Sequence, residues 1–441
     1  CGRKEIPVLD LIVRNARLAP PQTELSDIGI LDGAFVEIHP RIGAEARQTI
    51  DAAGLFVTPP FVESHVHLDT AMTAGQPRWN KSGTLFEGIE CWSERKALLS
   101  EQDVLERATA AVTWEVAHGV LHIRSHVDIC DPGLTALRAL LQLKKTMAPW
   151  VDIQLVAFPQ DGILGYPGGA RLLEDAIKAG ADAVGGIPHY ELTREDGVES
   201  LKTVFSLADT YGRLVDVHCD EIDDEQSRFV EVMSALALRT GLRDMVTASH
   251  TTAMHSYGGA YAAKLLRFCA RSGINFVANP LVNIHLQGRF DTFPKRRGLT
   301  RIKEMTQMGI NVSLGHDDIL DPWYPMGTGS MLDVAHMAAH VGQMMGTEEQ
   351  DAVFRMITYG GARTLHIEDS YGISVGRPAD LVVLDASDGR DAIRRQAVAR
   401  FVVSHGRIVS QSVPAHTTVN LGDGDCEVDF QMSQAGNSRE E

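Results

Sequence analysis

The feature that most constrains this chain is the alternation of apolar, β-rich segments with helix-like stretches through its middle. The β-rich segments end near eight polar residues: His67, His126, Gln160, His189, His218, His250, Asn279 and Asp317. Their ends are mostly about thirty residues apart, which is the size of one strand-plus-helix unit. Eight such units predict a closed (β/α)8 TIM-like barrel, which we expect over residues 57–369 of the 441.

Glycines mark where several of the predicted helices end, just before the next strand. They are Gly119, Gly180, Gly212, Gly241, Gly273 and Gly309. Glycine adopts the left-handed conformation at low cost and therefore often follows the last turn of a helix. The polar residues after each strand would then gather at the carboxyl end of the barrel, where the chemistry of such barrels takes place.

Both ends of the chain differ from its middle and favour a β module. Alternating strands are predicted at Leu11–Leu18, in a hairpin Ile28–Ile38 about Asp32-Gly33, and at Ala379–Asp385 and Arg400–Val409 with a turn between them. We expect residues 1–56 and 370–441 to form one small β-sandwich, followed by a loose polar tail from Ser433 to Glu441.

Charge and cysteine usage exclude several classes of protein. The chain has 41 Lys and Arg against 58 Asp and Glu, a net charge of −17, which disfavours nucleic acid as a partner. It contains no apolar run long enough for a membrane span. The six cysteines are sparse and form no C-x-x-C pair, so they are typical of reduced thiols in a cytoplasmic protein.

A set of candidate metal ligands lies at three of the predicted strand ends. His65 and His67 project to the same side of the first strand, although such a pair alone is more often structural. His218 ends the fifth strand and Asp317 the eighth, so all four side chains would meet. Three imidazoles and one carboxylate suit one divalent ion, Fe²⁺ or Zn²⁺, with a position left for water.

Other polar residues at the strand ends are candidates for catalysis or binding. Glu221 follows His218 by three residues and would lie beside the metal. His250 could orient a water molecule or stabilise charge, and the amide of Gln160 could bind an amide-like edge of a substrate. We expect the rest to support these residues or to be structural: His126, His189, Asn279, Asn283 and His285.

At these residues the sequence resembles the bacterial cytosine deaminase family over nearly its whole length. The runs that carry the resemblance are 64–70, 80–88, 217–227, 248–256 and 315–318. It implies that His65, His67, His218 and Asp317 bind one metal ion, that Glu221 shuttles protons, and that His250 lies beside the bound water. It also implies that Gln160 and the backbone of Leu85 hold the pyrimidine edge, with Asp318 near C5 of the ring. Trp323 completes the expected substrate-binding set.

The resemblance implies hydrolytic deamination of cytosine to uracil and ammonia by attack of a metal-bound hydroxide at C4, and it suggests a homo-oligomer. Binuclear relatives carry a bridging Lys on the fourth strand, and residues 183–190 contain none, which favours one ion. Alternatives are deamination of isoguanine or a 5-substituted cytosine, and opening of a cyclic amide. A silent metal- or base-binding protein is disfavoured because it would not need Glu221.

Overall fold

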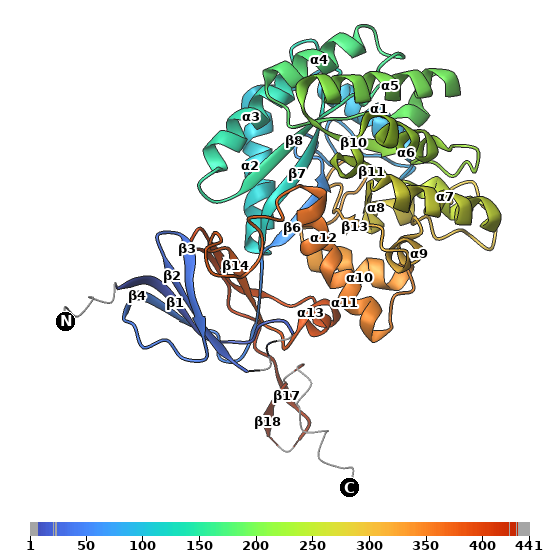
Figure 1. Cartoon of the computed structure of the whole chain (residues 1–441). Coiled ribbons are helices and arrows are strands. Elements are labelled where there is room, and N and C mark those ends of the chain that lie inside the picture. Colours follow the sequence, from blue (N-terminus) through green and yellow to red (C-terminus); the bar gives the residue numbers. More distant parts are fainter. Residues whose placement is uncertain (1–7, 21, 23, 423, 429, 431–441) are drawn as a thin grey trace. The chain divides into compact units, whose positions relative to one another are not determined.

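The computed structural model describes residues 8–20, 22, 24–422, 424–428 and 430 (Figure 1). The chain divides into two compact units, Phe61–Tyr371 and the pair of segments Cys1–Pro60 and Gly372–Glu441. The polar tail expected from Ser433 to Glu441 lies outside the described residues. Within the described part of the chain, no helix is both long and apolar enough to cross a membrane.

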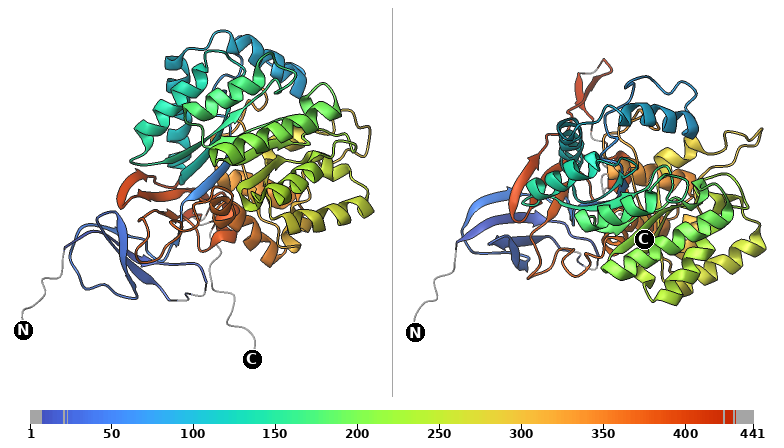
Figure 2. Two further views of the ribbon diagram at one scale, coloured as in Figure 1. Left: turned by 45° about the horizontal axis from the view of Figure 1, so that its top comes forward. Right: turned by 90° about the horizontal axis from the view of Figure 1, so that it is seen from above.

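The larger unit is built on eight parallel strands that follow one another in chain order (Figures 1 and 2). They are β6 (Phe61–Val66), β7 (Val120–Asp128), β8 (Asp152–Phe158), β9 (Ala183–Val184), β10 (Leu214–Cys219), β11 (Val246–His250), β12 (Asn275–Ala278) and β13 (Val312–Leu314). β6 and β13 are the two ends of this sheet, and a parallel bridge between Val66 and Asp317 joins them. The predicted (β/α)8 barrel is confirmed.

Helices lie outside the strands and cover the outer face of the sheet (Figure 2), while the side chains of its inner face pack inside the barrel. The strands are therefore buried on both faces, and all nine residues of β7 are buried, for example. The α-helices of this unit are α1 (Leu85–Lys96), α2 (Glu101–Ala117), α3 (Thr135–Met147), α4 (Gly169–Ala179), α5 (Arg194–Tyr211), α6 (Phe229–Thr240), α7 (Gly259–Ser272), α8 (Pro280–Leu286), α9 (Ile302–Gln307), α10 (Met331–Val341), α11 (Thr347–Met356) and α12 (Tyr359–Thr364).

Short 3₁₀ turns follow two of the strands, η1 (Pro188–Tyr190) after β9 and η3 (Thr252–Ser256) after β11, and a third, η2 (Arg243–Met245), directly precedes β11. The six glycines predicted to close helices all have positive φ, between 59° and 123°. The fourth strand is shorter than expected, because β9 ends at Val184 and His189 lies beyond it in η1. A Cβ on Gly185 would lie 2.5 Å from the carbonyl oxygen of Ala157, so only glycine allows this close approach to β8.

The smaller unit contains two four-stranded sheets that share one apolar core. The first has the order β3 (Ala34–His39), β2 (Ser26–Leu31), β1 (Leu9–Ala16), β4 (Ala46–Asp51), and the second the order β16 (Arg407–Gln411), β15 (Ala399–Ser404), β14 (Leu381–Leu384), β5 (Phe56–Thr58). Buried residues of both sheets, such as Leu11, Ile28, Leu381 and Val383, form one cluster, as a β-sandwich requires. β17 (Thr418–Asn420) and β18 (Asp425–Glu427) form a separate hairpin.

Local details of this unit both support and correct the expectations. β2 and β3 form the predicted hairpin, and Asp32 and Gly33 have the positive φ values, 51° and 76°, that a tight hairpin turn requires. The predicted single strand Arg400–Val409 is wrong: His405 and Gly406 turn the chain, so it forms the hairpin β15–β16. The turn expected before it was also wrong, because that segment contains helix α13 (Gly389–Arg395).

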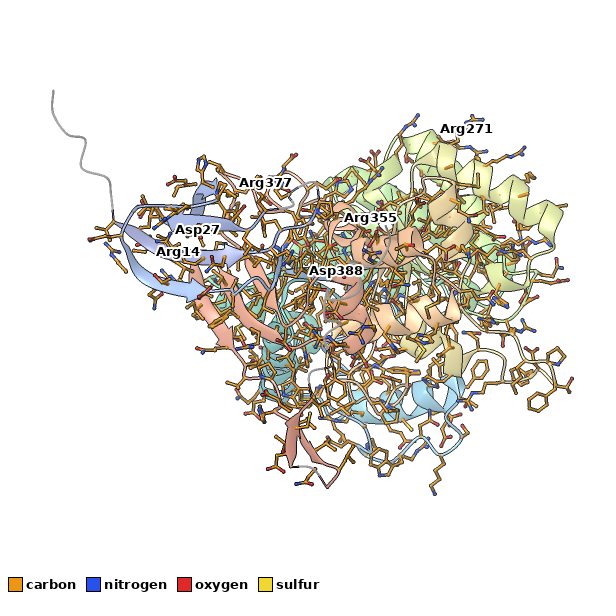
Figure 3. All side chains as sticks on the ribbon, turned by 90° about the horizontal axis from the view of Figure 1, so that it is seen from below. Arg14, Asp27, Arg271, Arg355, Arg377 and Asp388 are labelled. Atoms are coloured by element: carbon orange, nitrogen blue, oxygen red, sulfur yellow. The ribbon has the colours of Figure 1, made fainter. Side chains whose placement is uncertain are left out.

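An ion pair stabilises the first sheet of the smaller unit. Arg14 on β1 and Asp27 on β2, both labelled in Figure 3, lie 2.6 Å apart. Asp27 also accepts hydrogen bonds from the backbone of Asn15 and Ile42. Despite partial burial, these donors hold the pKa of Asp27 below its usual value. None of these groups belongs to the cavity described next.

Candidate active site

A cavity of about 340 Å³ lies at the carboxyl ends of the barrel strands. The residues that line it include most of the predicted site residues: His67, Leu85, Gln160, His218, Glu221, His250, Asp317, Asp318 and Trp323. His65 is completely buried beneath this surface. The structure therefore brings together all the residues that the sequence singled out for metal binding, catalysis and substrate binding.

The two histidines of the first strand face the acid of the last strand. His65 lies near the end of β6 and His67 directly follows it. Their Nε2 atoms lie 3.4 and 3.6 Å from the same carboxylate oxygen, Oδ1 of Asp317. The pair alone was weak evidence in the sequence, and its meeting with Asp317 makes it a candidate ligand set.

The backbone at the junction of the first and last strands holds Asp317 in an unusual conformation. Its φ is +72°, in the left-handed region that non-glycine residues rarely adopt. The Asp317 amide donates to the carbonyl of His65, and its own carbonyl accepts from the amide of His67, both at 2.8 Å. These bonds fix the carboxylate against the two imidazoles.

His218 completes the group from β10. Its Nε2 lies 3.1 Å from Nε2 of His67, so both rings point toward the same place. Burial lowers the pKa of His67 to about 3 and also lowers that of His218, so both rings are neutral and can present lone pairs. Neutral imidazole is the form that binds a metal ion.

The tautomer of His65 follows from a chain of hydrogen bonds inside the barrel. Its Nδ1 lies 3.0 Å from Oγ of Ser249, which donates to Oδ1 of Asp216 at 2.7 Å. Asp216 is in turn paired with Arg124 at 2.9 Å, and both are fully buried. The serine hydroxyl donates to the acid, so it accepts from Nδ1–H of His65, and this leaves Nε2 with its lone pair free.

These groups fit a divalent cation. Nε2 of His65 is buried and has no hydrogen-bond partner among the described residues. Burial and the nearby charge of Glu221 raise the pKa of Asp317. A nearby positive charge, such as a bound cation, would stabilise its ionised form. Overlapping trios of His, Asp and Glu ligand atoms lie within 4.8 Å of one another, including His65, His67 and Asp317. Three imidazoles and one carboxylate match zinc or iron.

Glu221 and His250 lie beside the ligand group. Oε1 of Glu221 is 3.2 Å from Nδ1 of His250 and accepts from the side-chain amide of Asn283 at 3.3 Å. The side-chain amides of Asn279 and Asn283 both contact His250, so these two residues hold His250 in place and are not candidate metal ligands. Burial raises the pKa of Glu221 to about 8, a range in which a carboxyl group can both take up and release a proton near neutral pH.

The cavity is also lined by the predicted substrate-binding residues. Nε1 of Trp323 donates to the carbonyl of Leu85 at 3.3 Å, which links two of them directly. A Cβ on Gly88 would lie 2.4 Å from the indole, so this glycine lets Trp323 pack on α1. Gln160 lies two residues beyond β8, and Asp318 lines the cavity beside Asp317.

The remaining polar residues take different positions. His189 lines the cavity, while His126 stacks on His65 with ring centroids 3.8 Å apart. His285 stacks on Tyr324 at 5.7 Å. Sequence reasoning missed Asp216 on β10, the strand that carries His218, and Ser249 on β11, the strand that carries His250. Asp216 is two residues before His218 and so shares its face of the strand, a signal that could have identified it.

Comparison with known proteins gives a consistent result. Residues 48–410 match the amidohydrolase family. The chain is 30% identical to N-isopropylammelide isopropyl amidohydrolase of Pseudomonas sp. (strain ADP), over 91% of this chain and 97% of that protein. It is 28% identical to the pterin deaminase of Rhizobium rhizogenes, over 88% and 89%. The crystal structure of 5-methylcytosine deaminase from Klebsiella pneumoniae with 5-fluorocytosine superposes with a TM-score of 0.89 at 48% identity, covering 92% of this chain and 98% of that one.

Proposed function

The chain belongs to the amidohydrolase family, and on that premise we propose that it deaminates cytosine to uracil and ammonia. The observation that carries the proposal is the position of Glu221, which lies against His250 and the metal-ligand group and lines the same cavity as Gln160. The 48% identity to a 5-methylcytosine deaminase supports the choice of a pyrimidine substrate.

We propose that His65, His67, His218 and Asp317 hold one divalent cation, Fe²⁺ or Zn²⁺. When bound, such an ion supplies a Lewis acid that lowers the pKa of a water molecule toward neutrality. Two features of the chain favour binding of this ion. The Ser249–Asp216 pair fixes the tautomer of His65, and burial keeps the imidazoles neutral.

Glu221 would move protons between water and substrate. Its carboxylate takes a proton from the attacking water and delivers one to ring N3 of cytosine, which makes C4 more electrophilic. The second proton of the water then goes to the exocyclic amine, so that the C4–N bond breaks and ammonia leaves. One water is consumed for each uracil and ammonia formed. Asn283 holds Oε1 of Glu221 in place for both transfers.

Other residues that line the cavity would hold the ring. The amide of Gln160 can donate to and accept from the pyrimidine edge. The carbonyl of Leu85 would bind beside it, oriented by the indole of Trp323. His250 would stabilise charge that develops at C4. Asp318 would lie near C5, where it limits the room for a substituent.

A second candidate is deamination of 5-methylcytosine, which the similarity to the Klebsiella pneumoniae enzyme favours. A screen for ammonia release from free bases, nucleosides and cyclic amides separates the possibilities. The proposal expects release from cytosine, and opening of a cyclic amide would release none. The matched control is Glu221→Gln, which keeps the shape of the side chain without its proton-transfer capacity.

Location and assembly are part of the proposal. Cys91, Cys130, Cys219 and Cys269 are buried free thiols, which suits a reducing compartment such as the cytoplasm. The homo-oligomer expected from the sequence stays a prediction.

A further inference from the structure

Glu191 is a buried acid that the proposed mechanism does not use. It follows η1 after the fourth strand, and only 8% of it is exposed. Its carboxylate binds the backbone of the loop after the third strand. Oε1 accepts from the amides of Ile163 and Leu164 at 2.6 and 3.2 Å, and Oε2 accepts from those of Leu164 and Gly165 at 3.1 and 2.8 Å. Three successive amides thus surround one anion, an arrangement known as a nest.

The loop is shaped to fit this carboxylate. Gly162 has φ of +89°, and a Cβ there would lie 3.0 Å from Oε2 of Glu191. Gly169 is similarly restricted, since its Cβ would lie 2.5 Å from the carbonyl of Ile163. The loop therefore depends on small residues at the points where it bends around Glu191.

The same loop begins with Gln160. The amide of Gly162 donates to the carbonyl of Pro159 at 2.9 Å, which makes a tight turn with Gln160 and Asp161 at its centre. Lys96 fixes the centre of this turn, since its Nζ lies 2.7 Å from Oδ2 of Asp161. Glu191 fixes the residues that follow the turn, through the amides of residues 163–165. The turn that carries Gln160 is therefore held by side chains from two other segments.

We propose that Glu191 is a positioning residue that sets the Gln160 amide for recognition of the pyrimidine edge. The proposal rests on the proposed function, because it requires Gln160 to bind substrate. Glu191 lines no part of the cavity itself, so it acts through the loop. Its removal should weaken binding of the ring and leave the metal-ligand group intact.

The test is a double-mutant cycle between Glu191→Gln and Gln160→Ala. The Glu191→Gln change would place an NH₂ donor among three backbone donors and would disturb the nest. We expect this variant to raise KM for cytosine about ten-fold or more, with kcat within about three-fold and metal content unchanged. In the Gln160→Ala background the same change should alter KM less than about three-fold, because coupled residues are not additive. An equal effect in both backgrounds, or a loss in kcat with unchanged KM, would overturn the proposal.

Two further variants keep the test decisive. Glu195→Gln, an exposed acid in the first turn of α5, is the matched control and should leave KM unchanged. Gly162→Ala disturbs the nest from the loop side and should reproduce the rise in KM, so it replaces Glu191→Gln in the cycle if that variant does not fold.

Hydrogen exchange separates this proposal from the proposed function. The amides of residues 163–165 should exchange faster in Glu191→Gln than in the parent, whatever the substrate, and unchanged protection would contradict the nest. If the parent does not release ammonia from cytosine, the proposed function fails by itself. The cycle is then run on the base that the parent does deaminate, and Glu191 is judged by its coupling to Gln160 there.

Discussion

The backbone amide of Asp317 donates to the carbonyl of His65 at 2.8 Å, joining the last strand of the barrel to the first at the point where both carry candidate metal ligands. The carboxylate of Glu63 strengthens this junction. It accepts from the amide of His65 at 2.8 Å and from the amide of His316 at 3.0 Å. Barrel closure and ligand geometry therefore depend on the same few hydrogen bonds.

We expect Glu63→Gln to weaken metal binding about 10–100-fold, the usual cost of disturbing groups that support metal ligands. The variant keeps the size of the side chain and loses one of its two acceptor oxygens. Competition with a chelator measures the affinity directly. The control is Glu106→Gln, an exposed acid on α2, which should bind metal like the parent. Equal affinities in Glu63→Gln and the parent would remove Glu63 from this role.

Gly315→Ala should damage the same junction from the other strand. A Cβ there would lie 2.6 Å from the carbonyl oxygen of His65 and 2.5 Å from Oδ1 of Asn279. The strands would have to separate, so we expect both a lower melting temperature and weaker metal retention. Thermal unfolding with and without metal checks this, and a variant as stable and as metal-rich as the parent would contradict it.

One tightly bound divalent ion per chain is expected, because the structure offers three imidazoles and Asp317, and the fourth strand has no Lys. Elemental analysis of fully active protein gives the stoichiometry, and two ions per chain would contradict the mononuclear site. Chelation should lower the melting temperature, since an ion at about 100 times its Kd stabilises the native state by about 2.7 kcal/mol.

Asp318 should set the preference at C5. It is 4% exposed, and burial together with the charges of Asp321 and Asp317 raises its pKa. Asp318 has a side-chain hydrogen bond to Asp321, and a methyl group on the ring offers no hydrogen bond to its remaining capacity. Leaving that capacity unsatisfied costs about 1–3 kcal/mol, or about 10–100-fold in kcat/KM. We expect the parent to prefer cytosine over 5-methylcytosine. Asp318→Ser and Asp318→Ala should lower the ratio of kcat/KM for cytosine to kcat/KM for 5-methylcytosine. An unchanged ratio in folded, metal-loaded variants would assign Asp318 to a structural role.

The barrel could be predicted because the strands are β-rich segments, each followed by or ending near a polar residue, with a helix-like stretch before the next. Parallel strands place these ends on one side, so the meeting of His67, His218 and Asp317 followed from topology. The expected end of the fourth strand near His189 was wrong, because β9 ends at Val184. Gly185 passes too close to β8 to carry a side chain, and the apolar character of the segment does not reveal this close approach. The His405-Gly406 turn was hidden inside a continuous β-rich run.

Contacts between side chains and distant backbone could not be predicted. The carboxylate of Glu63 binds an amide 253 residues away in the chain, and Ser249 contacts His65 across 184 residues. No local pattern encodes such pairs, since they depend on the register at which the strands meet. Glu191 is a further case, because an acid after a short turn is equally typical of an exposed loop.

The most direct test of the account is the reaction of purified, metal-loaded protein with cytosine, measured beside Glu221→Gln. The parent should form uracil and ammonia in equal amounts. The variant should keep its metal and lose at least about 100-fold in rate, because its amide cannot accept and return a proton. No ammonia from cytosine with the parent, or a Glu221→Gln rate within a few-fold of it, would contradict the proposed function.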